Sequence, residues 1–196
     1  MKKGLLILLS GPSGVGKGTV RKQIFKNTEL NLAYSISMTT RQPREGEVHG
    51  QDYFFVSEER FQEAIKNDEL LEHAKFVGNY YGTTKAYVEK LREEGKNVFL
   101  EIEVEGAKKV LKEYENDKGV LSIFLLPPSL YELEKRIRGR RSEPEEVIQE
   151  RLSKAKREMG LKKNYQFNVL NDNISRSSQE IARIIDLKIK ANKFED

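Results

Sequence analysis

A glycine-rich turn near the start of the chain has the residue types that bind phosphate. The apolar run Leu5–Leu9 leads into the letters SGPSGVGKGT, and Lys17 follows the last inner glycine of that string. Glycines let the backbone curl until successive N–H groups point at phosphate oxygens, while the following helix presents its positive end. The lysine then reaches the outer phosphates of a nucleoside triphosphate, which we expect this chain to bind. The residues of the predicted loop are Gly11, Pro12, Ser13, Gly14, Val15, Gly16, Lys17, Gly18 and Thr19.

One position departs from the usual pattern of such a loop. Ser or Thr normally follows the lysine and ligands the nucleotide's Mg²⁺, but here Gly18 follows it and the first hydroxyl comes at Thr19. Without that hydroxyl we expect Mg²⁺ to be carried mainly by phosphates and water, which suits an ion that dehydrates reluctantly. This arrangement favours phosphoryl transfer to a second bound phosphate over switch-like hydrolysis, and Thr19 can still contact phosphate.

The elements that must hold this loop read as a parallel sheet covered by helices. Leu5–Leu9, Val98–Ile102 and Val120–Leu126 have the continuous apolar character of strands buried on both faces, and Phe167–Leu170 reads as the last strand. Helical patterns follow them, the first beginning near Gly16. A later one opens with a Ser-x-x-Glu capping box. Alternating strands and helices predict right-handed βαβ units in a three-layer α/β core.

Two segments do not follow this alternation of strands and helices. Residues from about 33 to 93 carry short alternating strands, tyrosines and a glycine-rich turn, which indicates a small mixed lobe inserted in the core. Arg136–Glu158 is dense in charge and is punctuated by Gly139 and Pro144. That segment is typical either of a mobile, arginine-bearing lid or of a solvated helical hairpin.

Composition limits the class of protein. With 196 residues, 37% of them hydrophobic and 34% charged, the chain fits one soluble domain with insertions, and no apolar run is long enough for a membrane span. Met1–Leu9 imitates the start of a secretory signal, but the run is short and no cleavage site follows, so we interpret it as a strand. The absence of cysteine excludes a disulfide framework, thiol catalysis and Cys-ligated zinc, and it agrees with the cytoplasmic location that we expect.

Several stretches of the sequence, taken together, resemble guanylate kinases. They are SGPSGVGKGT, SISMTTRQPREGEVHGQDYFFVS, LLEHAKFVGNYYGTT, VFLEIEVEGAKKV and VLNDN, in the order and spacing of that family, from about Gly4 to about Ile185. The chain looks like a bacterial-type member, and glycine after the loop lysine is familiar in nucleoside monophosphate kinases. The resemblance implies a P-loop NTPase core with an inserted GMP-binding lobe and a helical lid. It also implies the reaction of ATP with GMP to give ADP and GDP, with Mg²⁺.

The same resemblance suggests how the chain is divided and what it binds. We expect residues 1–32, 95–130 and 160–196 to form the core, 33–94 the GMP-binding lobe and 131–159 the lid with its flanking helices, all in one guanylate kinase-like domain over about 4–185. The implied partners are ATP and GMP, with dGMP as a further acceptor. A net charge of +4 is slight, and we expect neither a nucleic acid nor a membrane as partner. The sequence does not distinguish a monomer from a homo-oligomer.

Family motifs assign side chains to the acceptor nucleotide. By this resemblance Ser37, Glu72 and Thr83 contact the guanine, and Arg41, Arg44, Tyr53 and Tyr81 contact the GMP phosphate. Guanine offers N1–H and an exocyclic N2–H₂ side by side, so one carboxylate accepts both, whereas adenine presents a bare acceptor at N1. An unpaired buried polar contact costs about 1–3 kcal/mol, so we expect Glu72 to reject AMP.

The implied reaction needs cations around the transferred phosphoryl group and no general base. The acceptor phosphate, with a second pKa of about 6, is already mostly ionised at neutral pH. Catalysis then consists of holding two anions together and neutralising charge. The candidate catalytic cations are Lys17, Arg41, Arg44, Arg136, Arg140 and Arg151, of which Arg136 and Arg140 share one predicted helix face. On general grounds Arg138 and Arg141 are as readily surface charges.

Two acids and an asparagine complete the predicted site. Glu101 and Glu103 point to one face of their predicted strand by its two-residue period. They end beside the phosphate loop if the strands are neighbours, where they can hold the metal's waters or a substrate-side arginine. Many family members have Asp here, so no residue is assigned as a certain metal ligand. Asn171 matches the family position near the ATP adenine.

Three alternative functions would each require features that differ from those of this sequence. Another small-molecule kinase on the same scaffold should lack the paired Ser37 and Glu72, which are present. A guanylate kinase-like interaction module would usually have lost Gly16 and Lys17, and these are present too. A nucleic-acid-binding ATPase needs a basic patch with stacking aromatics, whereas the tyrosines here cluster with the acceptor motifs.

Overall fold

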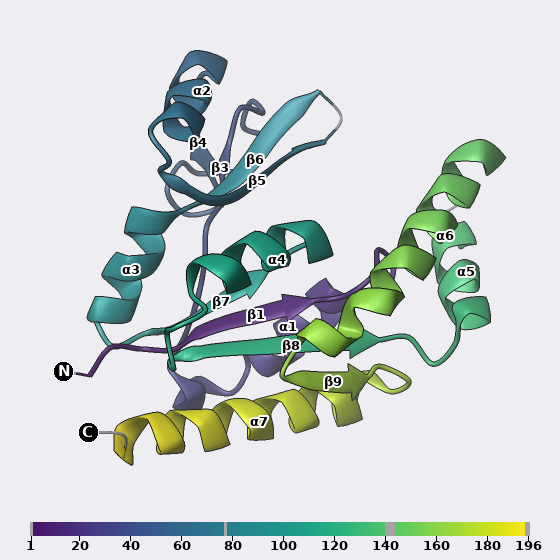
Figure 1. Ribbon diagram of the computed structural model, residues 1–196. Coiled ribbons are helices and arrows are strands. Elements are labelled where there is room, and N and C mark those ends of the chain that lie inside the picture. The colour runs from purple at the N-terminus through teal and green to yellow at the C-terminus, as the bar shows by residue number, and fades with distance from the viewer. Residues whose placement is uncertain (1, 77, 140–143, 195–196) are drawn as a thin grey trace.

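The phosphate loop follows the central strand of a five-stranded parallel sheet (Figure 1). The computed structural model describes residues 2–76, 78–139 and 144–194. The strands are ordered β2-β7-β1-β8-β9, and every neighbouring pair is parallel. Their bounds are β1 Leu6–Ser10, β2 Leu32–Tyr34, β7 Asn97–Glu101, β8 Val120–Leu126 and β9 Phe167–Leu170. The predicted parallel sheet is confirmed, and β1 and β7 each lie one residue from their expected bounds.

Alternate side chains around β1 point into two different hydrophobic cores. Leu5, Ile7 and Leu9 belong to one core, and Leu6 and Leu8 belong to the other. All of these side chains are fully buried. A strand can be apolar at every position only when both faces of its sheet are covered, so the three-layer α/β core predicted from these runs is confirmed.

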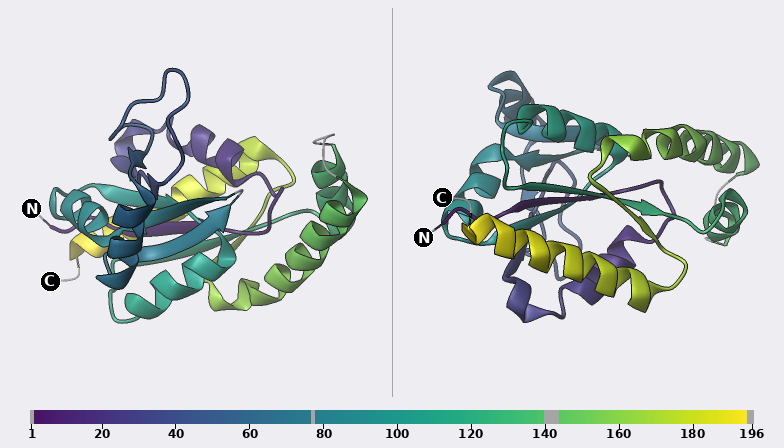
Figure 2. Two further views of the ribbon diagram at one scale, coloured as in Figure 1. Left: turned by 90° about the horizontal axis from the view of Figure 1, so that it is seen from above. Right: turned by 60° about the horizontal axis from the view of Figure 1, so that its bottom comes forward.

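Helices cover both faces of this sheet (Figure 2). Residues of α1 and α7 join the core on one face, and residues of α3 and α4 join the core on the other. The bounds are α1 Lys17–Ile24, α3 Lys85–Glu93, α4 Val104–Glu113 and α7 Ile174–Phe194, and the short 3-10 turn η1 spans Thr28–Leu30. None of the helices in the described ranges is long and apolar enough to cross a membrane.

A second, smaller sheet stands apart from the first (Figure 1). Its strands are ordered β4-β3-β6-β5, with bounds β3 Met38–Thr39, β4 Phe54–Phe55, β5 Leu70–Phe76 and β6 Asn79–Thr84. Helix α2 (Glu58–Lys66) begins after Ser57, whose hydroxyl accepts from the Arg60 N–H at 3.2 Å. The helix packs on the sheet through Phe61 and Ala64.

The ends of the predicted lobe range, 33–94, lie on the first sheet. Strand β2 includes Ala33 and Tyr34 and pairs with β7. Helix α3 buries Val88 in a core of the parallel sheet. Residues 33–40, with the sequence AYSISMTT, are therefore divided between two strands in different sheets, because β2 ends at Tyr34 and β3 begins at Met38.

The charged segment forms two helices beside the phosphate loop. Helix α5 spans Leu130–Arg138 and α6 spans Glu145–Met159, followed by the 3-10 turn η2, Gly160–Asn164. The predicted capping box is present, since the Ser129 hydroxyl accepts from the Glu132 N–H at 3.1 Å. The two helices lie side by side at one end of the sheet (Figure 2).

Candidate active site

The backbone of the phosphate loop packs too closely against its neighbours to carry side chains at two glycines. Gly11 and Gly16 have φ angles of +147° and +104°, which L side chains rarely adopt. A Cβ on Gly11 would lie 2.5 Å from the Leu125 carbonyl oxygen, and one on Gly16 would lie 2.9 Å from Asn171 Nδ2. The loop is therefore held between β8 on one side and Asn171 on the other.

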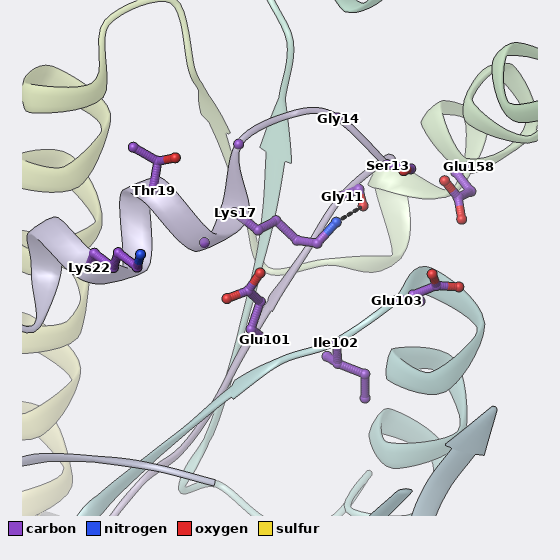
Figure 3. Close-up of a pocket in the computed structure, with 12 residues that line it drawn as sticks. Gly11, Ser13, Gly14, Lys17, Thr19, Lys22, Glu101, Ile102, Glu103 and Glu158 are labelled. Atoms are coloured by element: carbon purple, nitrogen blue, oxygen red, sulfur yellow. Dashed lines mark hydrogen bonds between the residues drawn. The ribbon is translucent and has the colours of Figure 1, made fainter. Parts of the chain in front are cut away.

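Lys17 begins α1 and points its ammonium group back across the loop (Figure 3). Its Nζ donates to the carbonyl oxygens of Gly11 at 2.6 Å and Pro12 at 3.4 Å. Burial lowers the pKa of Lys17, and the nearby Glu101 carboxylate opposes that effect. The cavity beside it has a volume of about 500 Å³ and is lined by Gly11, Ser13, Gly14, Gly16, Lys17, Gly18, Thr19, Lys22, Glu101, Ile102, Glu103 and Glu158. A glycine-rich loop with a half-buried cation suits a polyphosphate chain.

Glu101 and Glu103 both line this cavity, but the prediction that they share one strand face is wrong. Strand β7 ends at Glu101, whose carboxylate accepts from Arg21 Nε at 2.9 Å. Glu103 immediately precedes α4, and its carboxylate accepts from Lys154 Nζ at 2.8 Å. Glu103 therefore lies outside the strand, although its backbone is still extended and the helix begins only at Val104. The pairing of β7 with β1 still brings both acids beside the loop, as expected for neighbouring strands.

Asn171 and Arg136 hold the same carbonyl group of the phosphate loop. Val15 O accepts from Asn171 Nδ2 at 2.8 Å and from Arg136 Nη1 at 3.0 Å. Arg136 Nη2 also donates to Asn171 O at 3.1 Å. Both side chains line a second cavity of about 300 Å³, which shares Gly14, Gly16 and Thr19 with the Lys17 cavity. The structure thus places Arg136 against the loop backbone beside this second cavity.

Helix α6 brings Arg151 and Glu158 beside the phosphate loop. Arg151 Nη2 donates to the Ser13 hydroxyl at 2.9 Å. Glu158, two helical turns farther along the same face, lines the Lys17 cavity together with Ser13. Glu158 is buried, and burial raises the pKa of its carboxyl group, which Lys154 opposes. Sequence reasoning missed Glu158, although its spacing from Arg151 is a signal that would have placed it on that face.

Three residues assigned to the acceptor phosphate lie together in the smaller sheet. The Arg41 guanidinium is 5.3 Å from the centroid of the Tyr53 ring, and that ring is 6.1 Å from the Tyr81 ring. The pKa of Arg41 is raised, first by its hydrogen bonds to Glu47 and to a smaller extent by the Tyr81 hydroxyl. Arg44 lies exposed on the loop after β3.

Glu72 and Thr83 face each other across β5 and β6. They are register partners, and the Thr83 hydroxyl donates to Glu72 Oε1 at 2.8 Å. Glu72 is half-buried, and this burial raises the pKa of its carboxyl group while the Thr83 hydrogen bond lowers it. Ser37, the third predicted base contact, is in the segment that joins β2 to β3, where its carbonyl accepts from the Phe54 N–H at 2.9 Å.

Helix α4 connects the acceptor residues to the phosphate loop. A Cβ built on Gly106 would lie 3.0 Å from Glu72 Oε2, so the carboxylate rests against the first turn of this helix. Glu103, one turn earlier, lines the Lys17 cavity. The structure therefore brings the predicted base contact within a helical turn of the predicted triphosphate cavity. Of the predicted residues, Arg140 lies outside the described part of the chain.

Comparisons with known proteins identify relatives of this chain. A protein-family model described as guanylate kinase matches residues 3–188. The chain is 55% identical to a guanylate kinase of Mycoplasma capricolum subsp. capricolum, over 96% of this chain and 62% of that protein. It is also 55% identical to a guanylate kinase of Bacillus cereus, over 94% of this chain and 88% of that protein.

Solved structures extend the comparison to the fold. The crystal structure of guanylate kinase from Anaplasma phagocytophilum matches with a TM-score of 0.71 and 31% identity, covering 95% of this chain and 87% of that one. The SH3-kinase fragment of tight junction protein 3 matches with a TM-score of 0.52 at 9% identity, over 96% of this chain and 59% of that one, which shows a shared fold alone. The chain spans 62% of the length of its Mycoplasma capricolum relative. By its family match and its relatives, the chain belongs to the guanylate kinase family.

Proposed function

We propose that this protein transfers the terminal phosphoryl group of ATP directly to the phosphate of GMP, giving ADP and GDP. One observation carries the proposal: the Glu72 carboxylate rests against the same turn of α4 whose preceding residue, Glu103, lines the Lys17 cavity. A purine reader and a triphosphate cavity are thus close neighbours. The names of the relatives, guanylate kinase, support the same reaction.

The acceptor base is read by hydrogen-bonding pattern. Glu72 Oε1 already accepts from Thr83, and each carboxylate oxygen has capacity for a further donor. Guanine can donate N1–H and N2–H₂ to this carboxylate, and Ser37 is assigned to O6. The contacts assigned here read the base and the phosphate, so we propose dGMP as a second acceptor.

The chemical step requires positioning and positive charge. Lys17 serves the donor phosphates, Arg41 and Arg44 with Tyr53 and Tyr81 serve the acceptor phosphate, and Arg140 and Arg151 are proposed to neutralise the transferred group. Arg136 and Asn171 both bond Val15 O, so we assign them to holding the loop beside the adenine side of the donor. The acceptor needs no general base because its phosphate is already ionised at neutral pH.

Mg²⁺ fits this site as an ion carried by phosphate oxygens and water. Gly18 stands where such a loop usually offers a hydroxyl, and Glu101 and Glu103 already pair with Arg21 and Lys154. In the described ranges no group of three or more His, Cys, Asp or Glu side chains could hold a metal. Glu101 and Glu103 would accept hydrogen bonds from the ion's waters. Bound in this way, Mg²⁺ supplies charge neutralisation on the phosphates.

Each part of the fold is assigned one task in this reaction. We propose that the smaller sheet with α2 is the GMP-binding lobe, that α5 and α6 form the lid, and that the parallel sheet with its covering helices is the ATP-binding core. The cytoplasmic location expected from composition remains a prediction.

The proposal is tested by ADP release from Mg·ATP in a coupled assay, with GMP and AMP side by side. GMP should stimulate ADP release strongly and AMP little. Lys17→Met should abolish the stimulated rate, since the Lys17 ammonium group lies across the phosphate loop in this cavity. If neither nucleotide stimulates release above the rate with ATP alone, the proposed reaction is wrong, and phosphorylated sugars and phosphorylated partner proteins are the next ligands to test.

A further inference from the structure

A carboxylate outside the predicted substrate contacts holds the loop that carries Arg41 and Arg44. Arg41 Nη1 donates to Glu47 Oε2 at 2.9 Å, and Arg41 Nη2 donates to Glu47 Oε1 at 2.9 Å. The backbone N–H of Arg44 donates to Glu47 Oε2 at 2.7 Å. One side chain therefore fixes both arginine positions of the acceptor loop. These bonds lower the pKa of the Glu47 carboxyl group, so it is ionised when it makes them.

The pair is enclosed more than an ordinary surface ion pair. The side chains of Arg41 and Glu47 are 14% and 20% exposed. The rings of Tyr53 and Phe55 lie 5.3 Å and 5.8 Å from the Arg41 guanidinium. A freely exposed pair is worth little, but a bidentate pair that lies against two rings keeps a defined geometry.

The bonds that Arg41 makes to Glu47 and Gln42 use only part of its guanidinium. Glu47 takes one N–H from each Nη, and the carbonyl of Gln42 takes another from Nη1 at 2.8 Å. The edge formed by Nε and Nη2 remains, and its two N–H groups point the same way, which suits two oxygens of one phosphate. The Tyr81 hydroxyl, also assigned to that phosphate, helps to raise the pKa of this guanidinium, and the Tyr81 ring lies 6.1 Å from the Tyr53 ring.

We infer that Glu47 is a positioning residue for the acceptor phosphate, acting through Arg41 and the backbone of Arg44. It orients the Nε–Nη2 edge of Arg41 toward the phosphate site before the nucleotide arrives. The inference rests on the proposed function and adds to it a residue that does not touch substrate. The expected effect is selective. Replacing Glu47 should weaken binding of the acceptor phosphate and leave binding of the base and of the donor nucleotide unchanged.

The test compares Glu47→Gln with the wild type. A glutamine keeps the size but offers the guanidinium a single acceptor oxygen and turns an NH₂ group toward it. We expect the KM for GMP to rise roughly 10-fold or more, as for loss of a charge-assisted hydrogen bond, with the KM for ATP unchanged. The inhibition constant of guanosine, which has no phosphate, should also be unchanged. Glu47→Asp keeps the charge and should lie nearer to the wild type.

Glu69→Gln is the matched control, because Glu69 makes a similar two-oxygen contact with Arg60 in the same lobe, away from the acceptor residues. It should leave the KM for GMP unchanged. Equal losses for GMP and guanosine in Glu47→Gln would show general damage to the lobe, and tighter GMP binding would show that Glu47 competes with the phosphate; either result overturns the inference. If the wild type fails to turn GMP over, calorimetric binding of GMP without ATP still compares Glu47→Gln with the wild type. A failure of this inference can therefore be distinguished from a failure of the proposed reaction.

Discussion

Replacing Glu72 with glutamine should separate what this carboxylate does for substrate from what it does to the fold. The glutamine oxygen can keep the bond from the Thr83 hydroxyl, which is 2.8 Å in the wild type. The other oxygen, beside Gly106, becomes an NH₂ group that donates and cannot accept. A bound guanine then meets a neutral acceptor at one of its donors and another donor at the second.

The expected loss follows from these two contacts. Hydrogen bonds to charged groups are worth about 1.5–3 kcal/mol each and neutral ones about 1 kcal/mol. Losing one bond and neutralising the other amounts to about 2–5 kcal/mol, or roughly 30- to 5,000-fold in kcat/KM for GMP. Steady-state kinetics should include IMP, which lacks the exocyclic amino group. The loss of kcat/KM caused by the substitution should be smaller with IMP than with GMP.

The same substitution should raise the stability of the folded protein at neutral pH. Burial raises the pKa of the Glu72 carboxyl group. A raised folded-state pKa gives stability that is complete below the unfolded pKa and is lost as pH rises through the folded pKa. The Tm of Glu72→Gln minus that of the wild type should therefore be small near pH 4 and grow more positive as the wild-type carboxyl group ionises. Calorimetric scans across this pH range measure it.

Glu113→Gln is the control, since Glu113 lines the same small cavity as Glu72 and pairs with Lys85 at 2.8 Å. It should leave the kinetics with both nucleotides unchanged. The reasoning is refuted if Glu72→Gln keeps kcat/KM for GMP within about threefold of the wild type, less than one hydrogen bond is worth. Equal losses of kcat/KM with GMP and IMP would likewise contradict the idea that Glu72 recognises the exocyclic amino group of guanine.

Two further substitutions test the elements around the site. Gly106→Ala places a Cβ 3.0 Å from Glu72 Oε2 and 3.0 Å from the Ile102 side chain, and this displacement should raise the KM for GMP roughly 10-fold. Because Ala is favoured over Gly in a helix by about 1 kcal/mol, a Tm that does not fall would separate displacement of Glu72 from unfolding. Asn171→Ala removes the bonds to Val15 O and from the Ser177 hydroxyl, at 2.8 Å and 2.9 Å, and should lower the free energy of unfolding in urea by about 1–3 kcal/mol. It should also raise the KM for ATP and leave that for GMP unchanged, whereas equal changes would mean that Asn171 serves the fold alone.

The sequence by itself determined the features that depend on near neighbours in the chain. The apolar run before the glycines predicted a buried strand, and the glycines with Lys17 predicted a phosphate loop, because strand burial and loop curvature are both set within a few residues. The resemblance to guanylate kinases supplied Glu72 and Thr83, and the structure places them as register partners. The parallel sheet was likewise predictable from its apolar runs.

Only the tertiary structure decided which distant groups meet. Arg136 donates to Val15 O across a sequence separation of 121 residues, and no local pattern carries that pairing. Glu158 lines the same cavity as Ser13 because α6 packs beside the loop. The structure also decided that β7 ends at Glu101, so that Glu103 lies beyond the strand. It is likewise the folded loop that pairs Glu47 with Arg41. Hydrogen bonds and ion pairs of this kind depend on distance in space, which the order of residues does not specify until the chain has folded.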